Sequence, residues 1–312
     1  MTEKIATRDA YGQTLAELAA TDEKLVVLDA DLAKSTKTAE FAKAAPERFV
    51  EMGIAEQNMI GVAAGLATLG KHVFCSSFAI FAVGRAFEQV RNALAYPGLP
   101  VTVAATHAGI TVGEDGATHQ AIEDIALMRA VPNMTVIVPT DARETAQAVK
   151  ALAEYDKPAY LRLGRLAVET VMPADYQFTI GKGYVLREGS DAVIFACGLM
   201  VQEAMYAAEQ LAAEGINITV ANMATVKPLD TELVIHLAEK CKAVVTAEEH
   251  NIIGGLGSAV AEVLSENCPT PLLRVGVADS FGQSGKPAEL MAEYNLTAAA
   301  IAAKVREVIK RK

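Results

Sequence analysis

Short apolar runs alternate with amphipathic, helix-sized segments along almost the whole chain. In the first half, runs of this kind begin at Leu25 (LVVLDADL), His72 (HVFCSSF), Val101 (VTVAATH), Thr135 (TVIVP) and Pro158 (PAYLRLG). Because strands covered by helices on both faces are apolar throughout, the alternation predicts a mostly parallel sheet in an α/β fold. Thr7 and Asp141 precede two of the helical segments and are suitable residues to cap them.

The pattern changes at the segment VMPADYQFTIGKGYVLREGS, where Pro173 and several glycines interrupt any regular helix. A second alternating set follows, with runs that begin at Ala192 (AVIFACG), Ile218 (ITVANMATV), Ala243 (AVVTAEEH) and Leu272 (LLRVGVADSF). We therefore expect a first domain over residues 1–172, a linker over 173–190 and a smaller α/β domain over 191–312.

Composition excludes several classes of protein. The formal net charge is −10, and no cluster of Lys and Arg stands out that could neutralise nucleic-acid phosphates. No apolar stretch approaches the roughly 20 residues of a membrane-spanning helix, and the segment MTEKIATRDA lacks the apolar core of a signal peptide. We therefore expect a cytoplasmic protein that binds neither nucleic acid nor membrane. The cysteines are far apart and form no CxxC pair, so buried free thiols are expected.

The segment RFVEMGIAEQNMIGVAAGLATLG places Glu56 at the start of a very apolar helix. A carboxyl group in apolar surroundings should have a raised pKa, which suits a proton donor or a partner for a heterocyclic nitrogen. An acid at a helix N-terminus is also stabilised by the helix dipole without any chemical role. The local sequence leaves both interpretations open.

A second polar segment, THAGITVGEDGATHQAIED, follows the strand that begins at Val101. It gathers His107, Glu114, Asp115 and His119 among glycines, which let a backbone approach a ligand closely. These side chains can hydrogen-bond hydroxyls or phosphate. A metal site is the weaker interpretation, because the spacing matches neither an EF-hand nor an HExxH motif.

Two glycine-rich motifs in the second half suggest sites that their details do not support. AVVTAEEHNIIGGLGSAV puts a glycine-rich turn between a strand and a helix, but it lacks the third glycine and the ribose-binding acid of a dinucleotide site. GQSG at Gly282 differs from the GxSxG nucleophile elbow. We expect the turn to serve tight packing and the second domain mainly to buttress a dimer.

Several motifs together resemble the transketolase family. AEQN around Glu56, SFAIF from Ser77 and HAGITVGEDGATHQ from His107 are similar to the pyrimidine-binding domain of transketolases. The resemblance extends through ATRDAYGQ, DADLAKST, RAVPNMTVIVPTDARE, PAYLRLGR, VKPLD and SGKPAELM, and so covers essentially the whole chain. It implies a thiamine-diphosphate-binding fold of the pyrimidine type, followed by the transketolase C-terminal domain.

The resemblance implies cofactor roles for four residues. Glu56 matches the glutamate that bonds the N1′ nitrogen of the cofactor's aminopyrimidine and so promotes deprotonation of the thiazolium carbon. Phe78 and Phe81 match aromatic residues that stack on the pyrimidine, although core packing alone would also explain either one. His119 matches a residue near the 4′-amino group and the substrate.

The same resemblance implies sugar-phosphate substrates, with pentose phosphates as the default. Asp115 matches the residue that recognises the C2 hydroxyl of the donor. The implied reaction transfers a two-carbon ketol unit from a ketose phosphate to an aldose phosphate, while His107 and His119 move protons. Four positions match phosphate contacts of the family: Arg8, Ser35, His107 and Arg162.

No segment matches the family's diphosphate-binding domain, whose GDG motif and following Asn hold Mg²⁺ and the cofactor's diphosphate. GEDG at Gly113 is not that motif, because it belongs to the substrate loop. We therefore expect an N-terminal transketolase subunit to supply the GDG motif and the Mg²⁺ ligands in an α₂β₂ assembly. The isolated chain is expected to be inactive.

Other interpretations stay open at this stage. Deoxyxylulose-phosphate synthase and the beta subunit of 2-oxoacid dehydrogenases share the two-domain plan, and so would a non-catalytic regulatory subunit. GEDGATHQ and the phosphate positions favour transketolase, and Glu56, Asp115 and His119 argue against a non-catalytic chain. The segment FAVGRAFEQVR departs from the family, because Gly84 replaces an aromatic residue and the segment is one residue longer than in some relatives.

Overall fold

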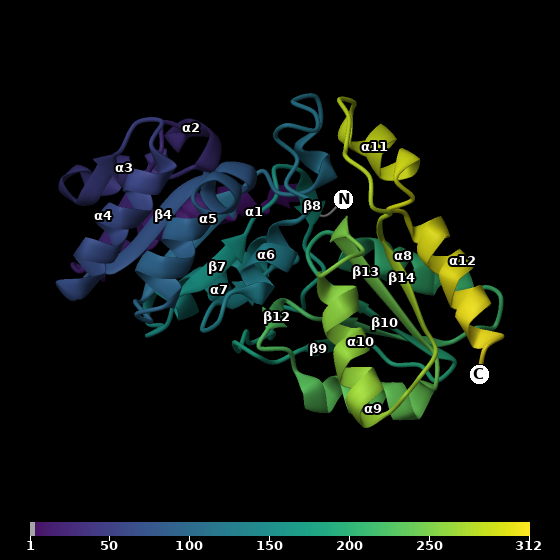
Figure 1. The fold of residues 1–312 in the computed structure, drawn as a ribbon. Helices are drawn as coiled ribbons and strands as arrows, with labels where there is room; N and C mark the ends of the chain where they lie inside the picture. The colour runs from purple at the N-terminus through teal and green to yellow at the C-terminus, as the bar shows by residue number, and fades with distance from the viewer. Residues whose placement is uncertain (1–3) are drawn as a thin grey trace.

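Two sheets lie in two adjacent lobes of the molecule, each with helices on its faces, in a computed structural model that describes residues 4–312 (Figure 1). The purple-to-teal half of the chain builds most of the larger sheet, and the teal-to-yellow half builds the smaller one. The prediction of a mixed α/β fold with mostly parallel sheets is confirmed.

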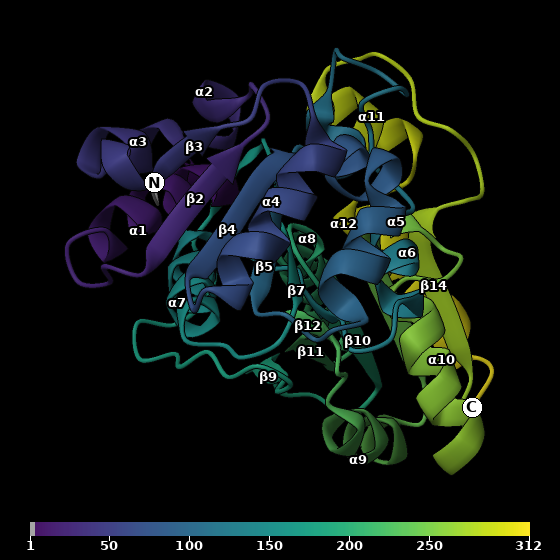
Figure 2. The same ribbon diagram turned by 60° about the vertical axis from the view of Figure 1, so that its left-hand side comes forward.

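The larger sheet has seven strands. The helices α1 (Thr7–Leu18) and α4 (Glu56–Thr68) lie on opposite sides of this sheet (Figure 2). Successive residues of β2 (Leu25–Asp29) pack alternately into the core beneath α1 and the core beneath α4. Because both faces are buried, the strand runs are apolar throughout. In spatial order the strands are β12 (Thr225–Lys227), β6 (Thr135–Ile137), β7 (Ala159–Arg162), β5 (Val101–Thr106), β4 (His72–Phe78), β2 and β3 (Phe49–Glu51).

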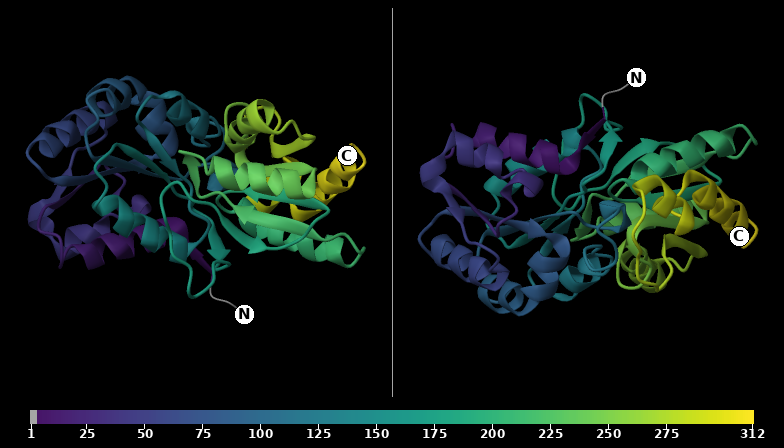
Figure 3. Two further views of the ribbon diagram at one scale, coloured as in Figure 1. Left: turned by 90° about the horizontal axis from the view of Figure 1, so that it is seen from below. Right: turned by 90° about the horizontal axis from the view of Figure 1, so that it is seen from above.

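The smaller sheet has five strands and lies beside the first in views from below and from above (Figure 3). Its helices α8 (Met200–Ala212) and α12 (Ala298–Ile309) pack on one face, and α9 (Thr231–Cys241) and α10 (Leu256–Asn267) pack on the other. In spatial order the strands are β14 (Leu272–Val277), β13 (Val244–Asn251), β10 (Ala192–Ala196), β11 (Ile218–Asn222) and β9 (Tyr184–Arg187).

Short elements complete the chain. β1 (Lys4–Ala6) and β8 (Ala167–Glu169) form a separate antiparallel pair. The other helices are α2 (Ala33–Thr36), α3 (Ala39–Ala44), α5 (Phe87–Gln89), α6 (Asp124–Ala130), α7 (Ala142–Ala153) and α11 (Pro287–Glu293), with the 3-10 turns η1 (Pro46–Arg48) and η4 (Ile110–Val112) and the π-helical turns η2 (Ile80–Arg85) and η3 (Val90–Ala95).

The structure corrects two expectations about the second half. The run ITVANMATV was expected to form one strand, but it divides into β11 and β12, and β12 crosses to the larger sheet and pairs antiparallel with β6. The expected linker 173–190 contains β9, which pairs antiparallel with β11 and belongs to the smaller sheet. The domain boundaries at 172 and 191 otherwise stay predictions.

Of the two expected helix caps, one behaves as predicted. The Asp141 carboxylate accepts a hydrogen bond from the Glu144 backbone N–H at 2.9 Å and so caps α7. Thr7 is instead the first residue of α1, and its Oγ1 accepts a bond from the Gly164 N–H at 2.8 Å. Thr7 therefore ties α1 to the end of the β7 strand rather than capping the helix.

Glu144 connects the two halves of the chain at the start of α7. Its Oε1 accepts hydrogen bonds from the Tyr176 hydroxyl at 2.6 Å and from Asn222 Nδ2 at 2.7 Å. Its Oε2 accepts a bond from the Thr140 N–H at 2.7 Å. Burial raises the pKa of Glu144 to about 7, since the hydrogen bonds only partly replace the lost water.

Glu144 should make the free energy of unfolding depend on pH. Below its ordinary pKa of 4.5 the carboxyl is protonated in both states, and as the pH rises the unfolded chain releases its proton first. Stability should therefore fall by about 3 kcal/mol as the pH rises through the folded pKa, and then level off. In the Glu144→Gln variant, the free energy of unfolding measured with denaturant should not show this fall over the same pH range. If the free energies of unfolding of the two proteins changed with pH in the same way, the raised pKa would not belong to Glu144.

Candidate active site

Glu56 opens α4 and is 2% exposed. The two carboxylate oxygens lie 3.1 and 3.0 Å from Arg85 Nη1, so the buried charge has a cationic partner. Arg85 ends the π-helical turn η2, in which the Ala86 N–H bonds to the Phe81 carbonyl. An i→i+5 turn encloses one more residue than an α-turn, as the extra residue expected in this segment would require. Arg85 was not among the residues predicted from the sequence.

Aromatic rings gather beside this ion pair. Phe78 and Phe81 lie nearly parallel with ring centroids 6.1 Å apart, and the Arg85 guanidinium carbon is 4.8 Å from the Phe81 centroid. His107 stacks on Phe78 at 3.8 Å, and His119 meets Phe81 edge-on at 5.4 Å. The structure thus brings together four of the residues that the sequence assigned to the site.

Arg8, Ser35 and His107 also meet. Arg8 Nη1 donates to the Ser35 carbonyl at 3.0 Å and lies 3.1 Å from His107 Nε2. Because Nε2 must accept from the guanidinium, the ring proton is assigned to Nδ1, which faces Thr106 Oγ1 at 2.8 Å.

His107 is held in its neutral form. Burial and then the positive charges of Arg8 and Arg165 lower the pKa of His107 to about 3. Its φ of 57° is in the left-handed region, which a residue other than glycine keeps only when its surroundings impose it. This geometry suits a fixed hydrogen-bonding group and argues against the proton-transfer role that the sequence suggested for His107.

Asp29 holds the turn that presents Ser35. Its Oδ2 accepts hydrogen bonds from the hydroxyls of Thr36 at 2.6 Å and Thr38 at 2.8 Å, and its Oδ1 accepts from the Leu32 N–H at 2.7 Å. Burial raises the pKa of Asp29 to about 6. The motif DADLAKST therefore folds around one buried carboxyl group at the end of β2.

Arg162 was predicted to bind phosphate, but the structure places it in a buried ion pair. It is 6% exposed, and its Nε donates to Asp124 Oδ2 at 2.7 Å. Its Nη2 donates to the Glu249 carbonyl at 2.9 Å and lies 3.2 Å from Asp124 Oδ1. A guanidinium so buried and so engaged has a structural role in the ion pair, and we correct the prediction that Arg162 binds phosphate accordingly.

Arg165 is the accessible arginine of the LRLGR motif. Its Nη1 donates to the Val112 carbonyl at 2.6 Å and lies 3.6 Å from Asp115 Oδ2. Its charge also contributes to the lowered pKa of Arg8, after burial. Arg165 therefore faces the same space as Arg8 and the substrate loop, although the sequence analysis did not select it as a site residue.

Asp115 and His119 lie at the tip of the loop between β5 and α6. Asp115 is exposed and His119 is half-buried, and the nearest polar partner of His119 is Thr118 Oγ1, 3.0 Å from Nδ1. Both side chains are thus accessible, and His119 is open to a ligand that lies against Phe81.

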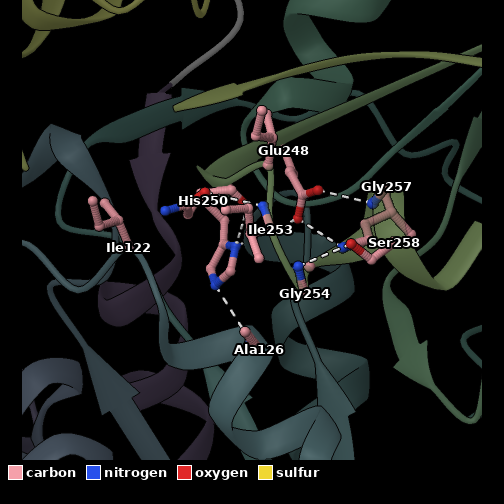
Figure 4. Close-up of polar contacts among 12 residues, drawn as sticks. Ile122, Ala126, Glu248, His250, Ile253, Gly254, Gly257 and Ser258 are labelled. Carbon is pink, nitrogen blue, oxygen red and sulfur yellow. Dashed lines mark hydrogen bonds and ion pairs between the residues drawn. The ribbon is translucent and has the colours of Figure 1, made fainter. Parts of the chain in front are cut away.

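The glycine-rich turn after β13 is filled by a side chain of the chain itself (Figure 4). The Glu248 carboxylate accepts bonds from the N–H groups of Leu256 at 2.7 Å and Gly257 at 2.8 Å. A Cβ at Gly255 would lie 1.9 Å from Glu248 Oε2, and His250 Nε2 accepts from the Ala126 N–H. Glu248 occupies the helix N-terminus where a nucleotide phosphate would bind, which supports a packing role for this turn.

Between residues 4 and 312 there is no group of three or more His, Cys, Asp or Glu side chains that could hold a metal ion. Over the same part of the chain, no helix has the length and apolar character needed to span a bilayer.

Comparison with known proteins agrees with this fold and site. The family model for the pyrimidine binding domain of transketolase matches residues 3–170, and the model for the transketolase C-terminal domain matches residues 181–301. A solved structure described as a split-gene transketolase, an inactive β4 tetramer, is 55% identical, with a TM-score of 0.91 over 99% of both chains.

Two curated relatives are transketolase subunits of similar length. The 6-deoxy-6-sulfo-D-fructose transketolase subunit SqwH of Clostridium sp. (strain MSTE9) is 46% identical over 98% of this chain and 95% of its own. One of the subunits of the apulose-4-phosphate transketolase of Phocaeicola vulgatus is 40% identical over 98% of both chains.

The chain belongs to the transketolase family. Within the family it corresponds to the C-terminal subunit of a split transketolase, because its split relatives align over almost their full length. The prediction of a C-terminal transketolase subunit is confirmed.

The two arginines of the LRLGR motif should differ sharply when removed. Arg162→Met leaves Asp124 buried without its partner, so the free energy of unfolding should fall by about 3–5 kcal/mol. Arg165→Met removes a partly exposed side chain and should cost less than about 1 kcal/mol. Denaturant unfolding of the two variants makes the comparison, and equal losses would show that Arg162 is not the structural member of the pair.

Proposed function

We propose that this subunit and a partner chain transfer a two-carbon ketol unit from a ketose phosphate to an aldose phosphate with thiamine diphosphate. The observation that carries the proposal is the buried Glu56 carboxylate, which accepts from a planar guanidinium lying on the Phe81 ring. Glu56 and Phe81 thus hold a flat, nitrogen-bearing group against an aromatic face. The neighbouring Phe78 stacks on His107, which lies close to the positive charges of Arg8 and Arg165.

Glu56, Phe78 and Phe81 fit the aminopyrimidine of the cofactor. Arg85 marks the place of that ring, since its flat guanidinium pairs with Glu56 and lies on Phe81. The hydrogen bond would run the other way with the cofactor, because an unprotonated ring nitrogen accepts from the carboxyl group of Glu56. Thiamine diphosphate, when bound, supplies an acidic carbon and an electron sink for cleavage of the ketose. Glu56 would hold the heterocycle through a hydrogen bond, and the two phenylalanines would orient it by stacking.

Arg8 and Arg165 fit the phosphate of the sugar, and His107 positions Arg8 for it. Arginine offers a planar fork of N–H donors for phosphate oxygens, and the Nε2 atom of neutral His107 accepts from Arg8 and holds that guanidinium in place. The backbone turn at Ser35 keeps Arg8 aimed at this space. Arg165 takes the place that the sequence interpretation gave to Arg162.

Asp115 and His119 complete the substrate site. We assign Asp115 to recognition of the C2 hydroxyl of the donor, because its carboxylate is exposed at the loop tip. We assign proton transfer to His119, since imidazole is suited to that task near neutral pH and this ring stands at the edge of Phe81.

The proposed partner is an N-terminal subunit whose GDG motif binds Mg²⁺ and the cofactor's diphosphate in an α₂β₂ complex. Two observations support it. A relative that shares 55% identity is described as an inactive tetramer of β subunits alone. A Cβ built at Gly61 or Gly65 of α4 meets no atom within 4 Å, so this face of the helix is open to another chain.

The decisive experiment is a reconstitution. The chain should be purified with a GDG-containing transketolase subunit from the same genome, loaded with thiamine diphosphate and Mg²⁺, and assayed with xylulose 5-phosphate and ribose 5-phosphate. We expect turnover by the complex and none by either chain alone. A verified, cofactor-loaded complex that turns over no ketose phosphate would overturn the proposal, and activity of this chain alone would overturn the need for a partner.

Glu56→Gln is the matched variant for this assay. The amide keeps the shape of the side chain but cannot carry the charge or exchange the proton of a carboxyl group. We expect the complex to form as before and its turnover to fall by about 100-fold or more. Turnover close to that of the unmodified complex would remove Glu56 from its proposed role.

Arg85 occupies the place proposed for the cofactor on Glu56 and Phe81. Its removal should therefore destabilise the free chain but strengthen cofactor binding by the complex. Arg85→Met should lower the free energy of unfolding of the free chain by about 1–2 kcal/mol, because a buried carboxylate loses its partner. In the complex it should tighten thiamine diphosphate binding by about 10-fold, as measured by calorimetry. Arg91→Met, in the neighbouring turn η3, is the control and should change neither quantity. Weaker cofactor binding by Arg85→Met would show that Arg85 assists the cofactor instead.

A further inference from the structure

The loop that carries Asp115 and His119 rests on the C-terminal half of the chain. Its turn η4 lies beside α11 in two views (Figure 1, Figure 2). The side chains at its tip are partly exposed, so burial does not fix their positions. Contacts at the base of the loop must do so.

Glu249 makes the most direct of these contacts. It lies in β13, is 5% exposed, and accepts a hydrogen bond through Oε1 from the Thr111 N–H at 2.6 Å. Gly109 has a φ of 84°, and a Cβ there would lie 2.2 Å from the Glu249 carboxyl carbon. The carboxylate is therefore pressed against the loop backbone at the point where the loop turns.

A second contact closes the other end of the loop. Gln120 is buried, and its Nε2 donates to the Gln283 carbonyl at 2.9 Å and to the Ile110 carbonyl at 3.1 Å. A Cβ at Gly116 would lie 2.5 Å from Ser284 Oγ, so the loop follows the segment from Gln283 closely. The GQSG motif, which matched no catalytic pattern, thus forms part of the support beneath the loop.

We propose that Glu249 is a positioning residue for the substrate loop, through which the C-terminal domain sets where Asp115 and His119 stand. The positioning itself depends only on the observed contacts, whereas its effect on catalysis rests on the proposed function. A displacement of about 1 Å in a catalytic group can cost about 100-fold in rate, so one hydrogen bond at the base of the loop is sufficient to matter.

The chemistry of the contact distinguishes a positioning role of the Glu249 hydrogen bond from an effect of the Glu249 charge. Arg162 donates to the main-chain carbonyl of Glu249 and not to its carboxylate. The Thr111 N–H needs only an acceptor oxygen, which an amide side chain also provides. Glu249→Gln should therefore preserve the loop, and Glu249→Ala should release it.

Amide hydrogen exchange of the full chain tests the positioning without any catalysis. We expect exchange in residues 110–120 to be about 10-fold or more faster in Glu249→Ala and unchanged in Glu249→Gln. Gln283→Ala is the control, because its main-chain carbonyl rather than its side chain accepts the bond from Gln120. Unchanged exchange in Glu249→Ala, or equal acceleration in Glu249→Gln, would overturn the proposal.

Kinetics of the reconstituted complex test the consequence. For Glu249→Ala we expect kcat/KM for the donor to fall about 10- to 100-fold, with a raised KM and an unchanged Kd for thiamine diphosphate. Glu249→Gln should stay within about 3-fold of the unmodified complex. Unchanged donor kinetics per folded complex would overturn a positioning role. Because the exchange measurement does not depend on turnover, an inactive unmodified complex would count against the proposed function alone.

Discussion

The buried ion pair between Arg162 and Asp124 is the interaction on which the centre of the molecule depends. Burial is the largest single effect on Asp124 and alone would raise its pKa, but the charges of Arg162 and His250 and the hydrogen bonds from Arg162 and Tyr160 together lower the pKa. The pair connects β7 to α6, and Arg162 extends it to the Glu249 carbonyl in β13. Two charges that are taken out of water are stable only when nearly all of their polar atoms have hydrogen-bond partners. The ion pair therefore restricts β7, α6 and β13 to the arrangement that provides these partners.

The candidate site is built outward from this centre. Glu249, held by its main chain to Arg162, presses its carboxylate on the loop at Thr111, and the loop presents His119 to Phe81. On the other side, Asp29 fixes the turn from which the Ser35 carbonyl holds Arg8. Arg8, Asp115, His119 and Arg165, which are proposed to meet the sugar, are therefore partly or fully exposed, while Asp29, Arg162 and Glu249, which aim them, are buried.

The sequence predicted most strands because their apolar runs reflect burial on both faces, a local property. It did not predict that β12 joins the larger sheet, because β12 pairs with β6 through backbone hydrogen bonds between segments that are far apart in the sequence. The motif around Glu56 and the two phenylalanines were found by resemblance, and the structure brings them together. The sequence analysis assigned phosphate binding to Arg162 and did not consider Arg165, since both belong to one motif and only the tertiary structure shows that Arg162 is the buried one. Arg85 was missed because a π-helical turn leaves no reliable pattern of its own.

The crossing of β12 also determines whether the two domains could exist as separate chains. β12 covers β6, which would otherwise present an unpaired strand edge to solvent, and exposed edges recruit other chains into aggregates. A gene cut between the two family domains would produce a first product with an open edge and a second with an orphan strand. The two domains are therefore coupled through one strand, and separation of the chain between them would leave the larger sheet incomplete.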